Sequence, residues 1–239
     1  MATRLASLCF DANDPVRLAS FWASALGWSL GDNPQGEVRV LPTDGTRFTF
    51  AFLPVLEPKT AKNPIHLHLV TESVGHQRQI VERLIELGAQ HVDVGQEAEA
   101  DHVVLGDPEG NEFCVLLRGE FNADTGFIAD IAFEPAHPAT GYFWGQAIGW
   151  PVVYDQDGDV AIRAPDQQGP FLTFGPPGTA KSGKNRLHLH LVPDAGADQE
   201  SEIDRLVALG ASHVEIGQGH APRVVLADPD ANEFCVLPY

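Results

Sequence analysis

An internal repeat constrains this fold more than any other feature of the sequence. The order and spacing of three distinctive segments in the first half of the chain recur in the second half. The matching pairs are FWASALGW (21–28) with FWGQAIGW (143–150), HLHLV (66–70) with HLHLV (188–192), and DPEGNEFCVL (107–116) with DPDANEFCVL (228–237). Such recurrence indicates a duplicated folding unit. We therefore expect two domains, residues 1–119 and residues 126–239.

Each predicted domain divides again into two similar halves. The first half starts with a strand-like stretch at 5–10, followed by a helix that begins at Asp14-Pro15 and ends at Gly27. The second half starts with a strand at 65–70, followed by a helical apolar stripe that ends at Gly88. Short strands follow each helix. The pattern predicts an α+β fold in which one unit, a strand, a helix and a strand meander, is used four times.

Alternation along the predicted strands gathers polar side chains on one face. Side chains of successive strand residues point to opposite faces. His66 and His68 therefore lie on one face, and the leucine between them points to the other face. By the same parity Glu112 and Cys114 share a face. The second repeat places His188, His190, Glu233 and Cys235 in the same way. Histidine, carboxylate and thiol groups are typical of metal or acid–base sites, although a His-x-His pair on a strand is more often a solvated or hydrogen-bonded face.

Charge and composition exclude several classes of function. The formal net charge is −18, which argues against nucleic acid and favours either cationic small molecules or solubility alone. The sequence has neither an apolar run long enough to span a membrane nor a signal-peptide pattern. Three cysteines, an odd and sparse count, fit a reducing compartment. We therefore expect a cytoplasmic protein that binds neither membrane nor nucleic acid.

The repeated segments resemble the vicinal oxygen chelate (VOC) superfamily, which contains glyoxalase I and the bleomycin-resistance proteins. The helix ending in FWASALGW, the strand with His66 and the turn and strand at 107–116 carry the resemblance. It implies tandem glyoxalase-like domains with four βαβββ modules, which pair to form incomplete barrels around a cleft. In some members of the superfamily the modules exchange partners, so Ser7 could share a cleft with either His66 or His188.

The resemblance also implies where ligands would lie. The first-strand ligand position falls on Ser7 and Asp130, and the histidine position falls on His66 and His188. The position of the final glutamate falls on Cys114 and Cys235. Because Ser7 is a poor ligand, we expect Asp130 to join the histidines of the second repeat and make the better site there.

Two hypotheses of function follow. The first is metal-assisted lyase, isomerase or oxygenase chemistry on a small organic molecule, with Zn, Ni, Fe or Mn as the divalent ion. The second is a metal-free protein that binds or sequesters a drug-like ligand. Under either hypothesis we expect a monomer or a homodimer. The candidate metal ligands are His66, His68, Asp130, His188 and His190, the candidate proton acceptors are Glu112 and Glu233, and the expected cleft residues are Ser7, Cys114 and Cys235.

The lysines and tryptophans add two smaller predictions. All four lysines lie in equivalent loops just before the two histidine strands, at positions 59, 62, 181 and 184. Such a loop either grips an anionic ligand or neutralises nearby carboxylates. The four tryptophans lie in the repeated helix segment at helical spacing, and we expect them in the core.

Overall fold

The computed structural model describes residues 3–31, 36–96, 101–134, 136–176, 181, 183–215 and 222–238. Its elements form four βαβββ modules in chain order. Module 1 contains β1 (Thr3–Ala12), α1 (Pro15–Leu26), β2 (Ser29–Leu30), β3 (Val38–Leu41) and β4 (Thr49–Pro54). Module 2 contains β5 (Ile65–Thr71), α2 (Val74–Glu86), β6 (Gln90–His91), β7 (Val103–Gly106) and β8 (Glu112–Leu117).

The second repeat contributes the other two modules. Module 3 contains β9 (Ile128–Phe133), α3 (Pro138–Ile148), β10 (Val152–Gln156), β11 (Asp159–Ile162) and β12 (Phe171–Phe174). Module 4 contains β13 (Leu187–Pro193), α4 (Gln199–Leu209), β14 (Ser212–His213), β15 (Val224–Ala227) and β16 (Glu233–Val236). The predicted α+β class and the fourfold use of one unit are confirmed.

The modules pair between repeats rather than within them. Sheet I has the order β14-β15-β16-β13-β1-β4-β3-β2 and therefore joins module 1 to module 4. Sheet II has the order β10-β11-β12-β9-β5-β8-β7-β6 and joins module 2 to module 3. At the centre of each sheet two first strands run antiparallel, β1 against β13 and β5 against β9. Each sheet is open, with two end strands, as an incomplete barrel requires.

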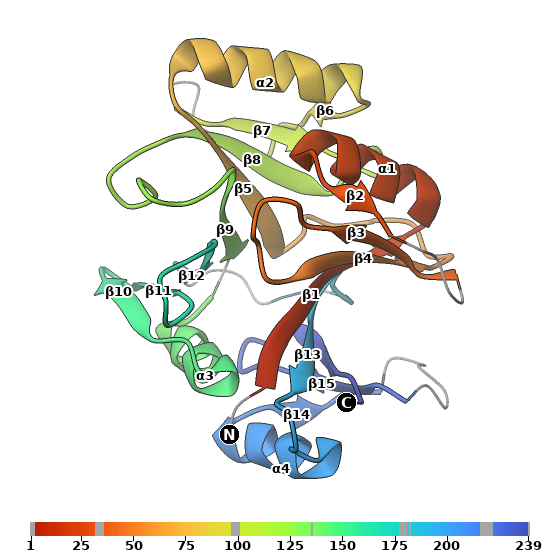
Figure 1. Cartoon of the computed structure of the whole chain (residues 1–239), viewed down its shortest axis with the longest axis vertical. Coiled ribbons are helices and arrows are strands. Elements are labelled where there is room, and N and C mark those ends of the chain that lie inside the picture. The colour runs from red at the N-terminus through yellow and green to blue at the C-terminus, as the bar shows by residue number, and fades with distance from the viewer. Residues whose placement is uncertain are drawn as a thin grey trace.

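The helices gather by repeat, in contrast to the sheets. Figure 1 shows α1 and α2 at one end of the molecule and α3 and α4 at the other. Arg83 on α2 donates to the carbonyl of Ser24 on α1 at 2.5 Å, and Arg205 on α4 donates to that of Ala147 on α3 at 2.9 Å. Each repeat therefore holds its own helices together, while each sheet and its concave face belong to both repeats.

Local sequence signals explain where the first helix begins and ends. The Asp14 side chain accepts a hydrogen bond from the backbone N–H of Arg17, and Pro15 occupies the first turn. Gly27 ends the helix in the left-handed region, with φ of 70°, which a residue without Cβ adopts at little cost. The predicted helix boundaries at Asp14-Pro15 and Gly27 are confirmed.

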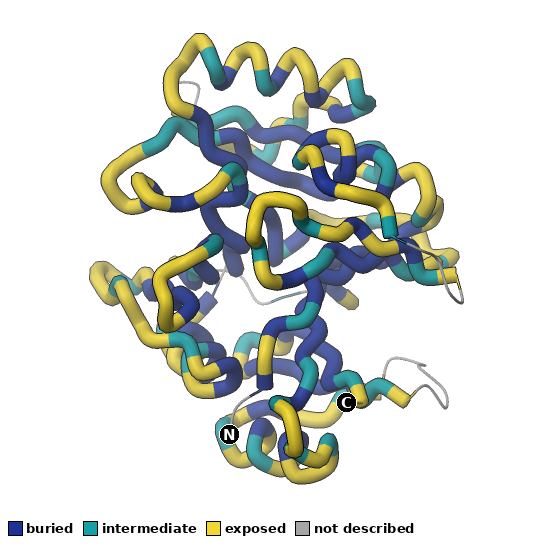
Figure 2. Tube along the Cα trace, viewed as in Figure 1, coloured by how far each residue is buried: buried dark blue, intermediate teal, exposed yellow. Residues whose placement is uncertain are grey.

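Aromatic packing joins the two modules of each repeat on the helix side. The ring centroids of Trp22 on α1 and Phe113 on β8 are 5.1 Å apart, and those of Trp144 and Phe234 are 5.0 Å apart. Trp22 and Trp144 are each 1% exposed, as expected for core residues. The tube in Figure 2 is dark blue along the central strands and yellow along the outer helix faces. Within the described residues, no helix is long and apolar enough to cross a membrane.

Candidate functional site

The two histidine strands occupy the centres of the two sheets and carry the same arrangement. Leu67 on β5 and Leu189 on β13 point into the hydrophobic core, and the flanking histidines point to the opposite face. His66 and His68 face each other with their Nε2 atoms 3.0 Å apart, and the Nε2 atoms of His188 and His190 are 3.2 Å apart. Each sheet therefore carries a pair of converging imidazoles.

On sheet II, the partner of the histidine pair is Asp130. The antiparallel register of β5 and β9 places Asp130 opposite His68, and His68 Nδ1 lies 2.9 Å from Asp130 Oδ1. The hydroxyl of Thr173 on β12 donates to the same carboxylate oxygen at 2.9 Å. The expectation that Asp130 would join His188 and His190 is wrong, because module exchange brings β9 beside β5. Asp130 completes the histidine set of the first repeat instead.

Three potential ligand atoms converge on sheet II. One atom each from His66, His68 and Cys114 lies within 4.8 Å of the others. Glu134 directly follows β9, with its Oε2 4.0 Å from His66 Nε2. Asp130 holds Nδ1 of His68, which turns the Nε2 atom of that ring toward His66. A carboxylate that orients a histidine in this way is typical of the outer shell of metal sites. Within the part of the chain that the structure describes, the buried Nδ1 of His66 has no hydrogen-bond partner.

The electrostatics of the sheet II site differ from one group to the next. Burial alone would lower the pKa of His68, but the charge and the hydrogen bond of Asp130 hold that pKa well above its ordinary value. Burial, followed by the nearby His68, lowers the pKa of His66 well below its ordinary value. Burial raises the pKa of Glu134. The site thus combines an imidazole with a lowered pKa, an imidazole with a raised pKa and a carboxylate that accepts protons more readily than usual.

Two cavities have Glu134 among their lining residues. The first, about 180 Å³, is lined by residues that include Lys62, His66, His68, Cys114 and Glu134. The second, about 290 Å³, is lined by residues that include Phe121, Tyr154, Asp159, Phe174 and again Glu134. Glu134 therefore lines both a histidine-lined cavity and an aromatic cavity. Such a combination of apolar walls and a few convergent polar groups is typical of small-molecule sites.

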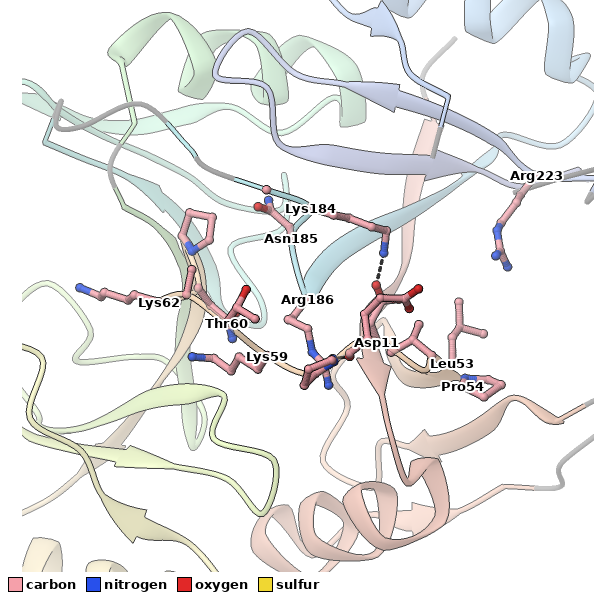
Figure 3. A pocket seen from close by; sticks show the side chains of 17 residues that line it. Asp11, Leu53, Pro54, Lys59, Thr60, Lys62, Lys184, Asn185, Arg186 and Arg223 are labelled. Atoms are coloured by element: carbon pink, nitrogen blue, oxygen red, sulfur yellow. Dashed lines mark hydrogen bonds and ion pairs between the residues drawn. The ribbon is translucent and has the colours of Figure 1, made fainter. Parts of the chain in front are cut away.

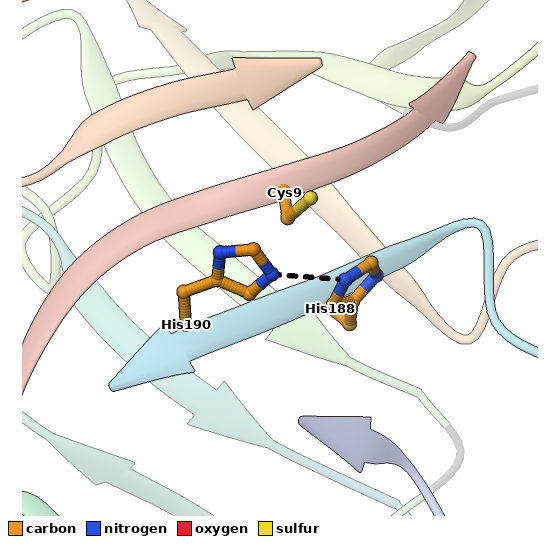
Figure 4. Close-up of side chains that lie close together, drawn as sticks. All are labelled: Cys9, His188 and His190. Atoms are coloured by element: carbon orange, nitrogen blue, oxygen red, sulfur yellow. Dashed lines mark hydrogen bonds between the residues drawn. The ribbon is translucent and has the colours of Figure 1, made fainter. Parts of the chain in front are cut away.

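Sheet I carries the corresponding residues with different chemistry. The register of β1 and β13 places Ser7 opposite His190 and Cys9 opposite His188. Cys9, His188 and His190 offer ligand atoms within 4.8 Å of one another and are all buried (Figure 4). Burial, assisted by Lys184, lowers the pKa of His188 to about 3. Burial and then His188 lower the pKa of His190, so both imidazoles are neutral.

The two glutamates named as proton acceptors are already engaged. Glu112 accepts from Lys59 Nζ at 2.6 Å and from the backbone N–H of Asn63 at 3.2 Å. Glu233 accepts from Lys181 Nζ at 2.6 Å and from the backbone N–H of Asn185 at 3.1 Å. Both oxygens of each carboxylate therefore hold the loop before the neighbouring histidine strand. We interpret Glu112 and Glu233 as structural anchors of these loops.

A larger cleft, of about 470 Å³, lies between the two lysine-bearing loops (Figure 3). Lys184 forms an ion pair with Asp11 there, and Arg186 pairs with Glu109 Oε2 at 2.7 Å. Lys59 and Lys181 pair with the anchoring glutamates. For these three lysines the structure favours charge neutralisation over a lid that grips an anion.

Sequence reasoning did not single out Cys9 and Glu134, although a signal was available. Cys9 follows Ser7 by two residues on the first strand of module 1. Glu134 follows Asp130 by four residues, directly after the first strand of module 3. Strand parity alone therefore places each on the face of its histidine pair. Ala132, the register counterpart of Cys9, lies opposite His66 on sheet II.

The paired βαβββ modules and the converging imidazoles on each sheet define a cleft-forming protein with metal-ligand groups at its centre. The chain belongs to the Glyoxalase-like domain family, which matches residues 7–116 and 129–237. No curated protein matches the sequence.

Two solved structures are similar over almost the whole chain. Glyoxalase I from Zea mays is 12% identical with a TM-score of 0.68, and the alignment covers 99% of this chain and 92% of that one. A putative dioxygenase from Bacillus subtilis is 14% identical with a TM-score of 0.64, covering 99% and 86%. At these identities the similarities establish a shared fold alone.

Proposed function

We propose that the face of sheet II is a metal-dependent active site for a small organic molecule, with chemistry of the lyase, isomerase or oxygenase type. The main support for this proposal is the contact between Asp130 and His68. The 2.9 Å contact with Asp130 Oδ1 engages Nδ1 of His68, so that Nε2 of the same ring faces His66. An imidazole that is fixed through one nitrogen presents the other nitrogen as a ligand.

His66, His68 and Cys114 would hold the divalent ion in this proposal. Three protein ligands leave a coordination position for an oxygen atom of the substrate. When bound there, the ion would supply Lewis-acid polarisation of a carbonyl or enolate oxygen. Asp130 keeps His68 in one tautomer and one orientation, and Thr173 fixes Asp130 in turn. Asp130 therefore acts as a positioning residue rather than as the ligand that the resemblance implied.

Glu134 would accept the proton. This residue lines both the histidine-lined and aromatic parts of the cleft, and its Oε2 is 4.0 Å from His66 Nε2. The side chain is 43% exposed, so it has room to reach a bound molecule. A raised pKa makes this carboxylate a stronger base than an ordinary glutamate once it is ionised.

The aromatic part of the cleft would bind the body of the substrate. Phe121, Tyr154 and Phe174 line it together with the acidic Asp159. Aromatic rings favour a planar ligand, and the acidic groups favour a neutral or cationic one over an anion. The same walls support a second candidate function, metal-free binding of a planar drug-like molecule, for which the histidines would be bystanders.

A thermal-shift screen separates the two candidates. Planar carbonyl- and diol-bearing compounds are added with and without Mn, Ni, Fe or Zn to the full chain and to His68→Ala and Tyr154→Ala. The enzyme proposal predicts a shift that requires metal and disappears in His68→Ala. A metal-independent shift that survives His68→Ala and disappears in Tyr154→Ala would instead support the binding protein.

A further inference from the structure

Sheet I brings thiols and imidazoles together from opposite ends of the chain. Cys9 on β1 lies opposite His188 on β13, and Cys235 on β16 lies beside His190 on the other side of β13. Figure 4 shows the Cys9 side chain directed to the same space as the two imidazoles. The three strands thus place two sulfur and two imidazole groups on one face.

We infer that Cys9, His188 and His190 form a second metal site, a closed thiolate–imidazole site for Zn(II), with Cys235 placed as the fourth ligand. Zinc prefers sulfur and nitrogen ligands in tetrahedral sets, and two cysteines with two histidines make a common structural set. The three core groups already offer ligand atoms within 4.8 Å of one another.

This site differs from the one on sheet II in both ligands and access. At the register position of Cys9, sheet II has Ala132, and at that of Asp130, sheet I has Ser7. Sheet I therefore has a thiol where sheet II has an alanine, and a serine where sheet II has the carboxylate that orients His68. Cys9 is 0%, Cys235 2%, His190 3% and His188 5% exposed. A closed set in so dry an environment favours a structural ion over a catalytic one.

Buried polar atoms give independent support. His188 is almost fully buried, and its Nδ1 has no hydrogen-bond partner among the described residues. The two imidazoles and the two thiols are all buried, and the Nε2 atoms of His188 and His190 lie 3.2 Å apart. Such burial is costly without partners. Metal ligation would engage these groups and tie the first strand of module 1 to the first strand of module 4, with the thiol protons released to solvent.

Cobalt spectroscopy tests this inference without confusion from the other sheet. Co(II) is loaded into the full chain carrying Cys114→Ser, so that a thiolate-to-cobalt charge-transfer band can come only from sheet I. The inference predicts this band, together with the intense visible bands of tetrahedral Co(II). Adding Cys9→Ser to the same chain abolishes the charge-transfer band or reduces it at least by half. Absence of the band in Cys114→Ser, or an unchanged band after Cys9→Ser, would overturn the site.

A second measurement covers the case in which Cys9→Ser does not fold. X-ray absorption at the zinc edge is recorded on the zinc-loaded Cys114→Ser chain, which leaves both sheet I thiols in place. The inference predicts sulfur in the first coordination shell, and a shell of nitrogen and oxygen alone contradicts it. Because neither measurement uses activity, and both remove the sheet II thiol of Cys114, failure here would leave the proposed function standing, and the reverse also holds.

Discussion

Asp130 and His68 form a carboxylate–imidazole pair across the boundary between the two sequence repeats, with Oδ1 and Nδ1 2.9 Å apart. Neither repeat contains this pair by itself. It exists because module 2 shares a sheet with module 3. The duplicated chain therefore holds two composite faces, and divergence at Ser7 and Asp130 has given them different chemistry.

Removing the carboxylate from this pair should weaken metal binding without abolishing it. Asp130→Asn leaves the ligands in place but no longer fixes the His68 tautomer. We expect a loss of about 10- to 100-fold in metal affinity, the usual effect of outer-shell substitutions. Calorimetric titration of the metal-free chain measures this. Ser7→Ala, the same register position on sheet I, is the matched control, and an equal loss there would refute the assignment.

The glutamates near the cleft should separate into structural and functional groups. Glu112→Gln removes the ion pair with Lys59, so we expect a loss of roughly 1–3 kcal/mol in the free energy of unfolding, with metal affinity unchanged. Glu134→Gln, at a partly exposed position, should change stability by about 0.5 kcal/mol or less. It should lower turnover of a substrate found by screening by ~100- to 10,000-fold. Urea denaturation and rate measurements on both variants check this pattern, and the reverse result would restore Glu112 as the base.

The indole donors in the core should contribute equally in the two repeats. Trp22 Nε1 donates to Asp107 Oδ2 at 3.2 Å, and Trp144 Nε1 donates to Asp228 Oδ2 at 3.0 Å. Trp22→Phe and Trp144→Phe leave a buried carboxylate short of one donor, so each should cost on the order of 1–3 kcal/mol. Chemical denaturation measures the loss. Trp150→Phe, at a partly buried site, is the control and should cost less.

The same two carboxylates predict an unusual dependence of stability on pH. Burial raises the pKa of Asp107 and of Asp228 from 3.8 to about 6. The folded state therefore favours the protonated carboxyl group. Its contribution to the free energy of unfolding is complete below the pKa that the group has in the unfolded chain. The contribution is lost as pH rises through the pKa that the group has in the folded chain. Each group should lose on the order of 3 kcal/mol between these limits.

Asp107→Asn cannot titrate and provides the comparison. As pH rises from about 4 to about 6, the free energy of unfolding of the unmodified chain should fall relative to that of this variant. Denaturation curves at closely spaced pH values measure this difference. A constant difference across the range would show that the hydrogen bonds of Asp107 offset its burial.

The sequence predicted most of the fold because the relevant signals are local. Asp14, Pro15 and Gly27 mark one helix, and the alternation around His66 and His68 marks the buried and open faces of a strand. Module pairing has no such signal. The apolar faces of β5 and β13 are almost identical, so either could pack beside β1 with similar burial. The partner of Asp130 depended on that choice.

The chemistry of the sites was predictable only in part for the same reason. Strand parity placed the histidines together on each face and could also have placed Cys9 and Glu134 there. Parity says nothing about loops, which approach a strand from far away in the chain. Lys59 and Lys181 reach back to Glu112 and Glu233 through such loops, and this contact changes two candidate bases into anchors.

The most direct test of the account is the metal content of the full chain purified without a histidine tag, measured by elemental mass spectrometry after loading and desalting. Unmodified protein is compared with His68→Ala on sheet II and His190→Ala on sheet I. We expect each variant to lose a different portion of the bound metal, and we expect His190→Ala to retain the sheet II portion. Metal content unchanged in His68→Ala would contradict the proposed site.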